Sequence, residues 1–144
     1  LDSVGNVEIF TSITIGADGL GLISYSEGGE LKVAHCSNTY CDDATISKLD
    51  NSKGYYSSIT VGVDGLGLIS YYGGSNLKVA HCSNSACDAA TISTLESAWD
   101  VGGFSSITVG ADGLGLISYY DWDNRDLKVA HLSNALGTPW TRRR

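Results

Sequence analysis

The sequence has very little proline, no methionine and no sustained helical pattern. Its 144 residues contain one proline but 18 glycines and eight tyrosines. This balance is typical of many short strands that are joined by glycine turns. No stretch repeats apolar residues every three and four positions, as an amphipathic helix requires. We therefore expect an all-β fold.

Positive charge is also scarce, because 9 basic residues face 16 acidic ones and the net charge is −7. Proteins that bind nucleic acid need a basic surface to neutralise phosphates, so we expect no nucleic-acid partner. The basic cluster 142–144 is interpreted as a solvated tail. No apolar run approaches the length of about 20 residues that a membrane-spanning helix needs, so we expect no membrane partner.

One phrase occurs three times, as IGADGLGLISYSE at 15–27, VGVDGLGLISYYG at 61–73 and VGADGLGLISYYD at 109–121. The aspartates of these phrases lie 46 and then 48 residues apart. A period near 46 is in the range of four-stranded β-propeller blades. A sandwich would also use short antiparallel strands, but it has no reason to repeat its sequence.

Each unit divides into four expected strands. The first, SITIG, ends at an Asp-Gly pair that is typical of a tight hairpin. LGLISYY and LKVAH follow, and ATISKL alternates apolar and polar residues as an exposed outer strand should. A looser glycine-bearing segment then leads to the next unit. We predict an all-β propeller domain with three four-stranded blades, at about 1–48, 49–94 and 95–144.

Three blades leave two apolar sheet faces bare, whereas closed propellers have four to eight blades. Residues 1–3 align with 95–97, and 139–144 align with 89–94, so the sequence holds whole repeats divided within an outer strand. Two copies joined head to tail would continue the pattern. This predicts a homodimer that closes one six-bladed ring. The alternative is that the chain is part of a longer propeller.

The four cysteines form two pairs in equivalent places, CSNTYC (Cys36, Cys41) and CSNSAC (Cys82, Cys87). Each pair flanks the connection between the third and fourth strands, so a bond across each loop is feasible. We favour disulfides, and hence a secreted or periplasmic location, over free thiols or a metal site. A metal site is disfavoured because the adjacent histidines, His35 and His81, would point to the opposite strand face.

Other candidate sites are weaker. The equivalent histidines His35, His81 and His131 could form a metal- or anion-binding ring, but a structural role with backbone hydrogen bonds is favoured. The segment 121–126 (DWDNRD) is an insertion with three carboxylates, yet its spacing matches no complete calcium loop. We interpret it as a solvated acidic loop, and we expect no cofactor.

No catalytic motif is present, and nearly identical blades are poorly suited to an asymmetric active site. Repeated units suit several equivalent weak binding sites instead. The candidate ligand-binding residues are Trp99, Trp122, Arg125 and Trp140, whose side chains could stack on or bind sugars. Tyr25, Tyr71 and Tyr119 are equivalent, but their strand position favours core packing over sugar stacking.

The unit SITIGADGLGLISYSEGGELKVAHCSN resembles propeller-type repeats of bacterial and environmental proteins of unassigned function. Its architecture is similar to that of six-bladed lectins assembled from short chains, although no sugar-binding motif of those lectins is matched. The resemblance implies a ligand-binding or scaffold module, with carbohydrate as the ligand class. The alternatives are a purely structural assembly repeat and a hydrolase or lyase with a central-channel site.

Overall fold

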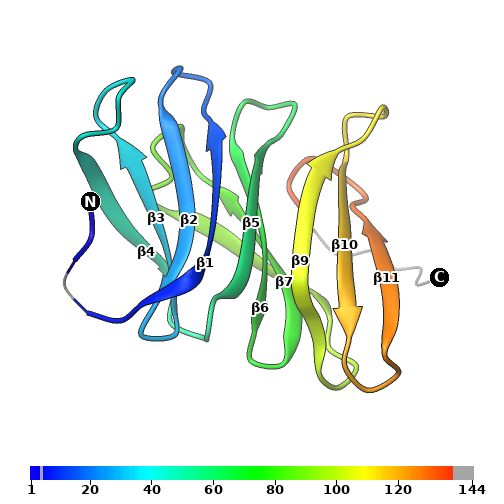
Figure 1. Ribbon diagram of the computed structural model, residues 1–144. Helices are drawn as coiled ribbons and strands as arrows, with labels where there is room; N and C mark the ends of the chain where they lie inside the picture. The colour runs from blue at the N-terminus through cyan, green and yellow to red at the C-terminus, as the bar shows by residue number, and fades with distance from the viewer. Residues whose placement is uncertain (4, 138–144) are drawn as a thin grey trace.

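The computed structural model describes residues 1–3 and 5–137, which form eleven β-strands in three antiparallel sheets (Figure 1). Each sheet is a simple meander in which consecutive strands pair. Sheet 1 contains β1 (Val7–Ile15), β2 (Gly21–Glu27), β3 (Glu30–Cys36) and β4 (Ala44–Asp50). Sheet 2 contains β5 (Tyr55–Val61), β6 (Gly67–Gly73), β7 (Asn76–Cys82) and β8 (Ala90–Glu96). Sheet 3 contains β9 (Val101–Val109), β10 (Gly115–Asp121) and β11 (Asp126–His131).

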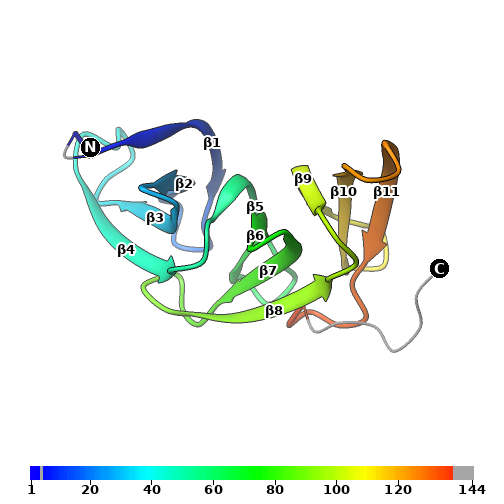
Figure 2. The same ribbon diagram turned by 90° about the horizontal axis from the view of Figure 1, so that it is seen from below.

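The three sheets stand side by side in an arc (Figure 2). The first strands β1, β5 and β9 are neighbours on the inner side, while β4 and β8 run along the outer side. The all-β prediction and the order of strands within each unit are therefore confirmed. The fourth strand expected for the third unit, at 139–144, lies outside the described residues. In the described part of the chain no helix is long and apolar enough to cross a membrane.

The Asp-Gly pair turns the chain as expected, within the connection 16–20: Ile15 pairs with Gly21, and Gly16 donates its N–H to the carbonyl of Leu20. One local expectation was wrong, because the segment before SITIG is not a loose linker. It belongs to the inner strands, which continue through a β-bulge between Val7 and Thr11 in β1 and at the corresponding places in β5 and β9. A bulge lets a strand bend without leaving its sheet.

The hydrophobic core consists of the two junctions between neighbouring sheets. Leu31 and Val33 of sheet 1 are buried in one cluster with Ile59 and Tyr71 of sheet 2. The equivalent residues of sheets 2 and 3 form the second cluster. The repeated apolar residues are therefore buried between sheets rather than within one sheet.

Buried serines tie neighbouring sheets together. Ser57 donates to Ser24 over 3.0 Å, and the equivalent pair Ser70 and Ser105 lies at 2.9 Å. Because an unpaired buried hydroxyl costs about 1–3 kcal/mol, these pairs favour one register between the sheets.

The three repeated tyrosines are core residues, as favoured from the sequence. Tyr71 is fully buried and donates its hydroxyl to Asp50, at the end of the preceding sheet's outer strand, over 2.6 Å. Tyr119 makes the equivalent bond to Glu96, and Tyr25 makes it to Asp2 over 2.7 Å. Burial, followed by the bond to the carboxylate, raises the pKa of Tyr71 far above its ordinary range.

Both predicted disulfides, Cys36–Cys41 and Cys82–Cys87, are present, with Cα–Cα distances of 4.8 and 4.9 Å. None of the four cysteines is free, so the thiol and metal alternatives are not supported. In sheet 3 the buried side chain of Leu132 occupies the place of the first cysteine. Disulfides persist in oxidising compartments, so the two bonds suggest an extracellular or periplasmic location.

Replacing Cys36 and Cys41 together by alanine should lower the free energy of unfolding by about 2 kcal/mol, because a short loop loses its cross-link. The sheets should still form, since sheet 3 has no such bond. Urea unfolding followed by circular dichroism measures the difference. Reduction of the wild-type protein is the control, and it should lower stability at least as much. Unchanged stability in both cases would contradict a structural role.

The Asp50→Asn substitution should destabilise the protein by about 1–3 kcal/mol at pH 7, because Tyr71 and Lys78 lose an ionised partner. Burial alone would raise the pKa of Asp50, but bonds from Tyr71 and Ser52, together with the charge of Lys78, outweigh it and lower the pKa below 3.8. The stabilisation is therefore complete above that value and is lost as the pH falls through the folded-state pKa.

Urea unfolding of the wild type and this variant at pH 7 and pH 3 tests the sign. The difference in the free energy of unfolding between the wild type and Asp50→Asn should be smaller at pH 3 than at pH 7. Glu30→Gln is a matched control, because Glu30 and Lys48 form an exposed pair at 3.3 Å that should contribute under about 1 kcal/mol. A pH-independent loss in Asp50→Asn would contradict the ionic role.

Candidate functional site

The inner strands bring three equivalent aromatic residues together. Phe10, Tyr56 and Phe104 each precede a repeated isoleucine by three positions. The ring centroids of Phe10 and Tyr56 lie 4.7 Å apart, those of Tyr56 and Phe104 4.3 Å, and those of Phe10 and Phe104 5.9 Å. Three sheets thus contribute to one aromatic cluster on the inner side of the arc.

The bulges of the inner strands place these rings. Tyr56 and Phe104 have φ angles of 53° and 51°, in the left-handed region that bulky residues rarely adopt. Such backbone conformations cost on the order of 1–3 kcal/mol each and gather at functional sites. The two aromatic side chains are held at this position despite that cost.

Sheet 3 extends the cluster at one end. Trp122, in the β10–β11 connection, lies with its ring centroid 5.5 Å from Phe104 and 5.0 Å from Tyr120. Its indole lies against the strand at Gly103, where a Cβ atom would approach Trp122 Nε1 to 2.5 Å. The absence of a side chain at Gly103 therefore makes room for the tryptophan ring.

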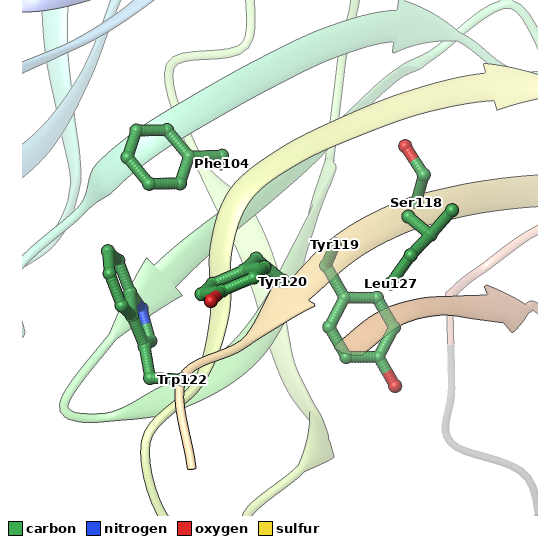
Figure 3. Close-up of a pocket in the computed structure, with 6 residues that line it drawn as sticks. All are labelled: Phe104, Ser118, Tyr119, Tyr120, Trp122 and Leu127. Atoms are coloured by element: carbon green, nitrogen blue, oxygen red, sulfur yellow. The ribbon is translucent and has the colours of Figure 1, made fainter. Parts of the chain in front are cut away.

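These rings border a cavity of about 420 Å³ (Figure 3). The figure shows Trp122, Phe104 and Tyr120 grouped at one end, with Leu127 and Ser118 at the other. The cavity is also lined by Tyr119. Phe104, Phe10 and Trp122 remain 52%, 40% and 38% exposed, so much of this aromatic surface faces solvent. A contiguous exposed apolar surface of this kind is typical of a ligand or interaction site.

A few polar groups border the aromatic cluster. Tyr72 packs at 6.3 Å from Tyr56, and its hydroxyl donates to Asp100 over 2.5 Å. Burial, followed by this bond to Asp100, raises the pKa of Tyr72, so its hydroxyl stays protonated. An apolar surface with a small number of oriented polar groups can bind a ligand and fix its orientation.

The sequence-predicted ligand residues are not all brought together. Trp122 belongs to the cluster, and Arg125 stands in the same connection, immediately before β11. Trp99 is 83% exposed in the β8–β9 connection and takes no part in the ring contacts of the cluster. Trp140 lies outside the described residues. A ligand-binding role for all four stays a prediction.

Sequence reasoning missed Phe10, Tyr56 and Phe104. Their signal was a constant spacing, because each stands three residues before Ile13, Ile59 or Ile107. This signal is weak in the sequence, because one of the three is tyrosine and two are phenylalanine, and because they stand in the glycine-bearing segment between units.

The inserted segment 121–126 is ordered by its first residue. Asp121 is buried, and it accepts hydrogen bonds from the backbone of Asp123 and from both the backbone and side chain of Asn124. The Asn124 side-chain bond is the main cause of its lowered pKa. The expectation of a wholly solvated acidic loop was therefore wrong for Asp121, which caps the turn. Within residues 1–3 and 5–137 no group of three or more His, Cys, Asp or Glu side chains is arranged to hold a metal ion.

Each repeated histidine is bound to the aspartate of its own Asp-Gly turn. Nε2 of His35 lies 2.7 Å from Asp18, and the equivalent distances are 2.7 Å for His81–Asp64 and 2.6 Å for His131–Asp112. The favoured structural role holds, but the partner is a carboxylate rather than the backbone. These pairs stabilise the turns and do not gather at one site.

Searches against protein families and against curated proteins find no match. Among solved structures, a GH43 β-1,3-galactosidase is similar with a TM-score of 0.67 and 12% identity, over 88% of this chain and 30% of that one. A second GH43 β-1,3-galactosidase, with galactodeoxynojirimycin, has a TM-score of 0.60 and 12% identity over 93% and 46% of the two chains. An α-L-arabinofuranosidase from Lactobacillus brevis has a TM-score of 0.58 and 13% identity over 92% and 51%.

The chain thus spans between about a third and about half of the length of these similar proteins. At this identity the likeness shows the fold alone. The three sheets are arranged as in the β-propellers of these glycoside hydrolases. The protein therefore has a β-propeller-like, all-β fold.

Proposed function

We propose that the protein is a carbohydrate-binding module whose ligand stacks on the aromatic cluster of Phe10, Tyr56, Phe104, Tyr120 and Trp122. One observation carries this proposal: the inner strands of three sheets hold aromatic rings together at a surface that stays open to solvent. The sequence repeats alone would not require aromatic residues there.

A sugar ring fits such a surface for a physical reason. Its C–H groups can pack on an aromatic face, while its hydroxyls keep hydrogen bonds with polar groups or water. Tyr120 and Trp122 each combine a large ring with a polar atom, and the guanidinium of Arg125 stands in the same connection.

Binding is favoured over hydrolysis. Glycosidases with the common mechanism use two carboxyl groups on either side of the scissile bond. The inner strands β1, β5 and β9 carry a single carboxylate between them, that of Glu8. The similar solved structures of sugar-acting enzymes are compatible with a carbohydrate ligand. The other carboxylate that borders the cluster, that of Asp100, accepts a hydrogen bond from the hydroxyl of Tyr72.

The finer architecture forms part of the same proposal. In a ring of six four-stranded blades made from two copies, the aromatic cluster would occur twice. Two linked sites bind a multivalent glycan more tightly than one, without any new contact. The competing scaffold interpretation expects no ligand at either cluster.

A glycan array followed by calorimetry on the bound sugar tests the site. Trp122→Ala should weaken binding about tenfold or more, because a stacked ring loses its apolar contact. Tyr40→Ala is the matched control, since Tyr40 is an exposed aromatic residue of the β3–β4 loop outside the cluster, and it should bind as the wild type does. No binding to any glycan would favour the scaffold alternative, and equal binding by Trp122→Ala would place the site elsewhere.

A further inference from the structure

The two outermost sheet faces expose side chains that are buried everywhere else in the structure. Ile13 of sheet 1 is 63% exposed, whereas its equivalents Ile59 and Ile107 are 5% and 6% exposed. Leu127 of sheet 3 is 80% exposed, whereas its equivalents Leu31 and Leu77 are fully buried. The same side chains are therefore covered at both internal junctions and uncovered at the two ends of the arc.

The two uncovered faces are the two halves of an internal junction. At each such junction, β3 or β7 supplies the leucine and valine of LKVAH, and the inner strand of the next sheet supplies the isoleucine. Sheet 3 presents Leu127 and Val129 without a following sheet, and sheet 1 presents Ile13 without a preceding one. The face of sheet 3 therefore lacks the isoleucine that sheet 1 presents, and the face of sheet 1 lacks the leucine and valine that sheet 3 presents.

The polar groups of the internal junctions also recur at the two ends. Inside the chain, Ser24 pairs with Ser57, and Ile59 donates its N–H to the hydroxyl of Ser12. The position equivalent to Ser24 in sheet 3 is Ser118, and that equivalent to Ser57 in sheet 1 is Thr11. Both are hydroxyl residues, so the same hydrogen bond is available between the ends.

We propose that sheet 3 of one copy packs against sheet 1 of a second copy through the contacts that join neighbouring sheets inside the chain. The reciprocal contact then closes the two copies into a ring. The interface is heterologous at each junction but closed by the two-fold axis. This packing covers Leu127 and Ser118, which line the cavity beside Trp122, so the proposed sugar site is the aromatic cluster of the inner strands and not that cavity.

The junction between copies differs from the internal ones at one place. Gly54 and Gly102 pack so closely on the preceding sheet that a Cβ atom would lie 2.4 Å from Leu31 Cβ or 2.8 Å from Leu77 Cα. The equivalent residue of sheet 1 is Glu8, which cannot make this approach unchanged. The face of sheet 3 differs at the corresponding end of its strands, because the β10–β11 connection is two residues longer than the β2–β3 and β6–β7 connections.

These two differences, Glu8 on sheet 1 and the longer β10–β11 connection on sheet 3, bring opposite charges. Inside the chain, the residue just before β3 or β7 accepts a backbone hydrogen bond from the next sheet: Gly29 from Gly54, and Ser75 from Val101. The equivalent residue before β11 is Arg125, and the equivalents of Val101 and Gly54 are Val7 and Glu8. The inferred packing therefore sets Arg125 of one copy beside Glu8 of the other, an ion pair specific to the junction between copies.

Sedimentation equilibrium of the 144-residue chain, at micromolar concentrations, is the first test. The expected mass is twice 15.1 kDa. Leu127→Asp and Ile13→Asp should each raise the dissociation constant at least tenfold, while Tyr40→Asp, at an exposed position of the β3–β4 loop, should leave it unchanged. A wild-type monomer, or open oligomers that grow with concentration, would overturn the closed ring.

Mixing the two face variants tests the geometry. A pair made of one Ile13→Asp copy and one Leu127→Asp copy contains one intact junction, so the mixture should associate more strongly than either variant alone. If the interface instead joined two copies of sheet 1, only Ile13→Asp would weaken association, and mixing the two variants would not restore it. That result would overturn the proposal even if the protein is a dimer.

Charge exchange tests the register. Glu8→Arg and Arg125→Glu should each weaken association about tenfold, and the double variant should recover most of the loss. Near-ultraviolet circular dichroism of each variant checks that the sheets remain folded. Additive losses in the double variant would exclude the Glu8–Arg125 pair.

Discussion

Packing of one sheet against the next is the interaction on which the rest of this structure depends. A single meander of four short strands has two faces and cannot bury both by itself. Leu31, Val33, Ile59 and Tyr71 become a core only because two neighbouring sheets meet. The unit of stability is therefore the junction, as in other repeat proteins whose units rely on their neighbours.

Polar contacts make each junction specific. Apolar packing alone would tolerate sliding of one sheet along another, but the Ser24–Ser57 pair and the Tyr71–Asp50 bond are satisfied in one register. The tyrosine hydroxyl reaches the outer strand of the preceding sheet, so it links the outer edge of one unit to the buried strand of the next. These paired buried polar groups thus align the sheets, while the leucines and isoleucines supply most of the burial.

The aromatic cluster follows from the same arrangement. Once the junctions set neighbouring sheets side by side, the three inner strands run next to one another, and bulges at equivalent places turn three rings toward a common point. Sheet 3 departs from the repeat, because its longer β10–β11 connection carries Trp122, which extends the cluster on that side. Function is most readily built where repeats differ, because a difference has no role in maintaining the repeat.

Much of the architecture could be read from the sequence by itself. The period near 46, the Asp-Gly turns and the paired cysteines determined the all-β repeat, the strand order and both disulfides, because these are local patterns that recur in equivalent places. The candidate site could be predicted only in part, through Trp122 and its neighbour Arg125. Tertiary structure alone decided that Phe10, Tyr56 and Phe104 meet, since each lies on a different sheet and the bulges that aim them depend on strand pairing. It also decided which repeated residues are covered: Ile13 and Ile59 both stand in a Ser-Ile-Thr segment, yet of these two Ile59 alone has a preceding sheet within the chain to bury it.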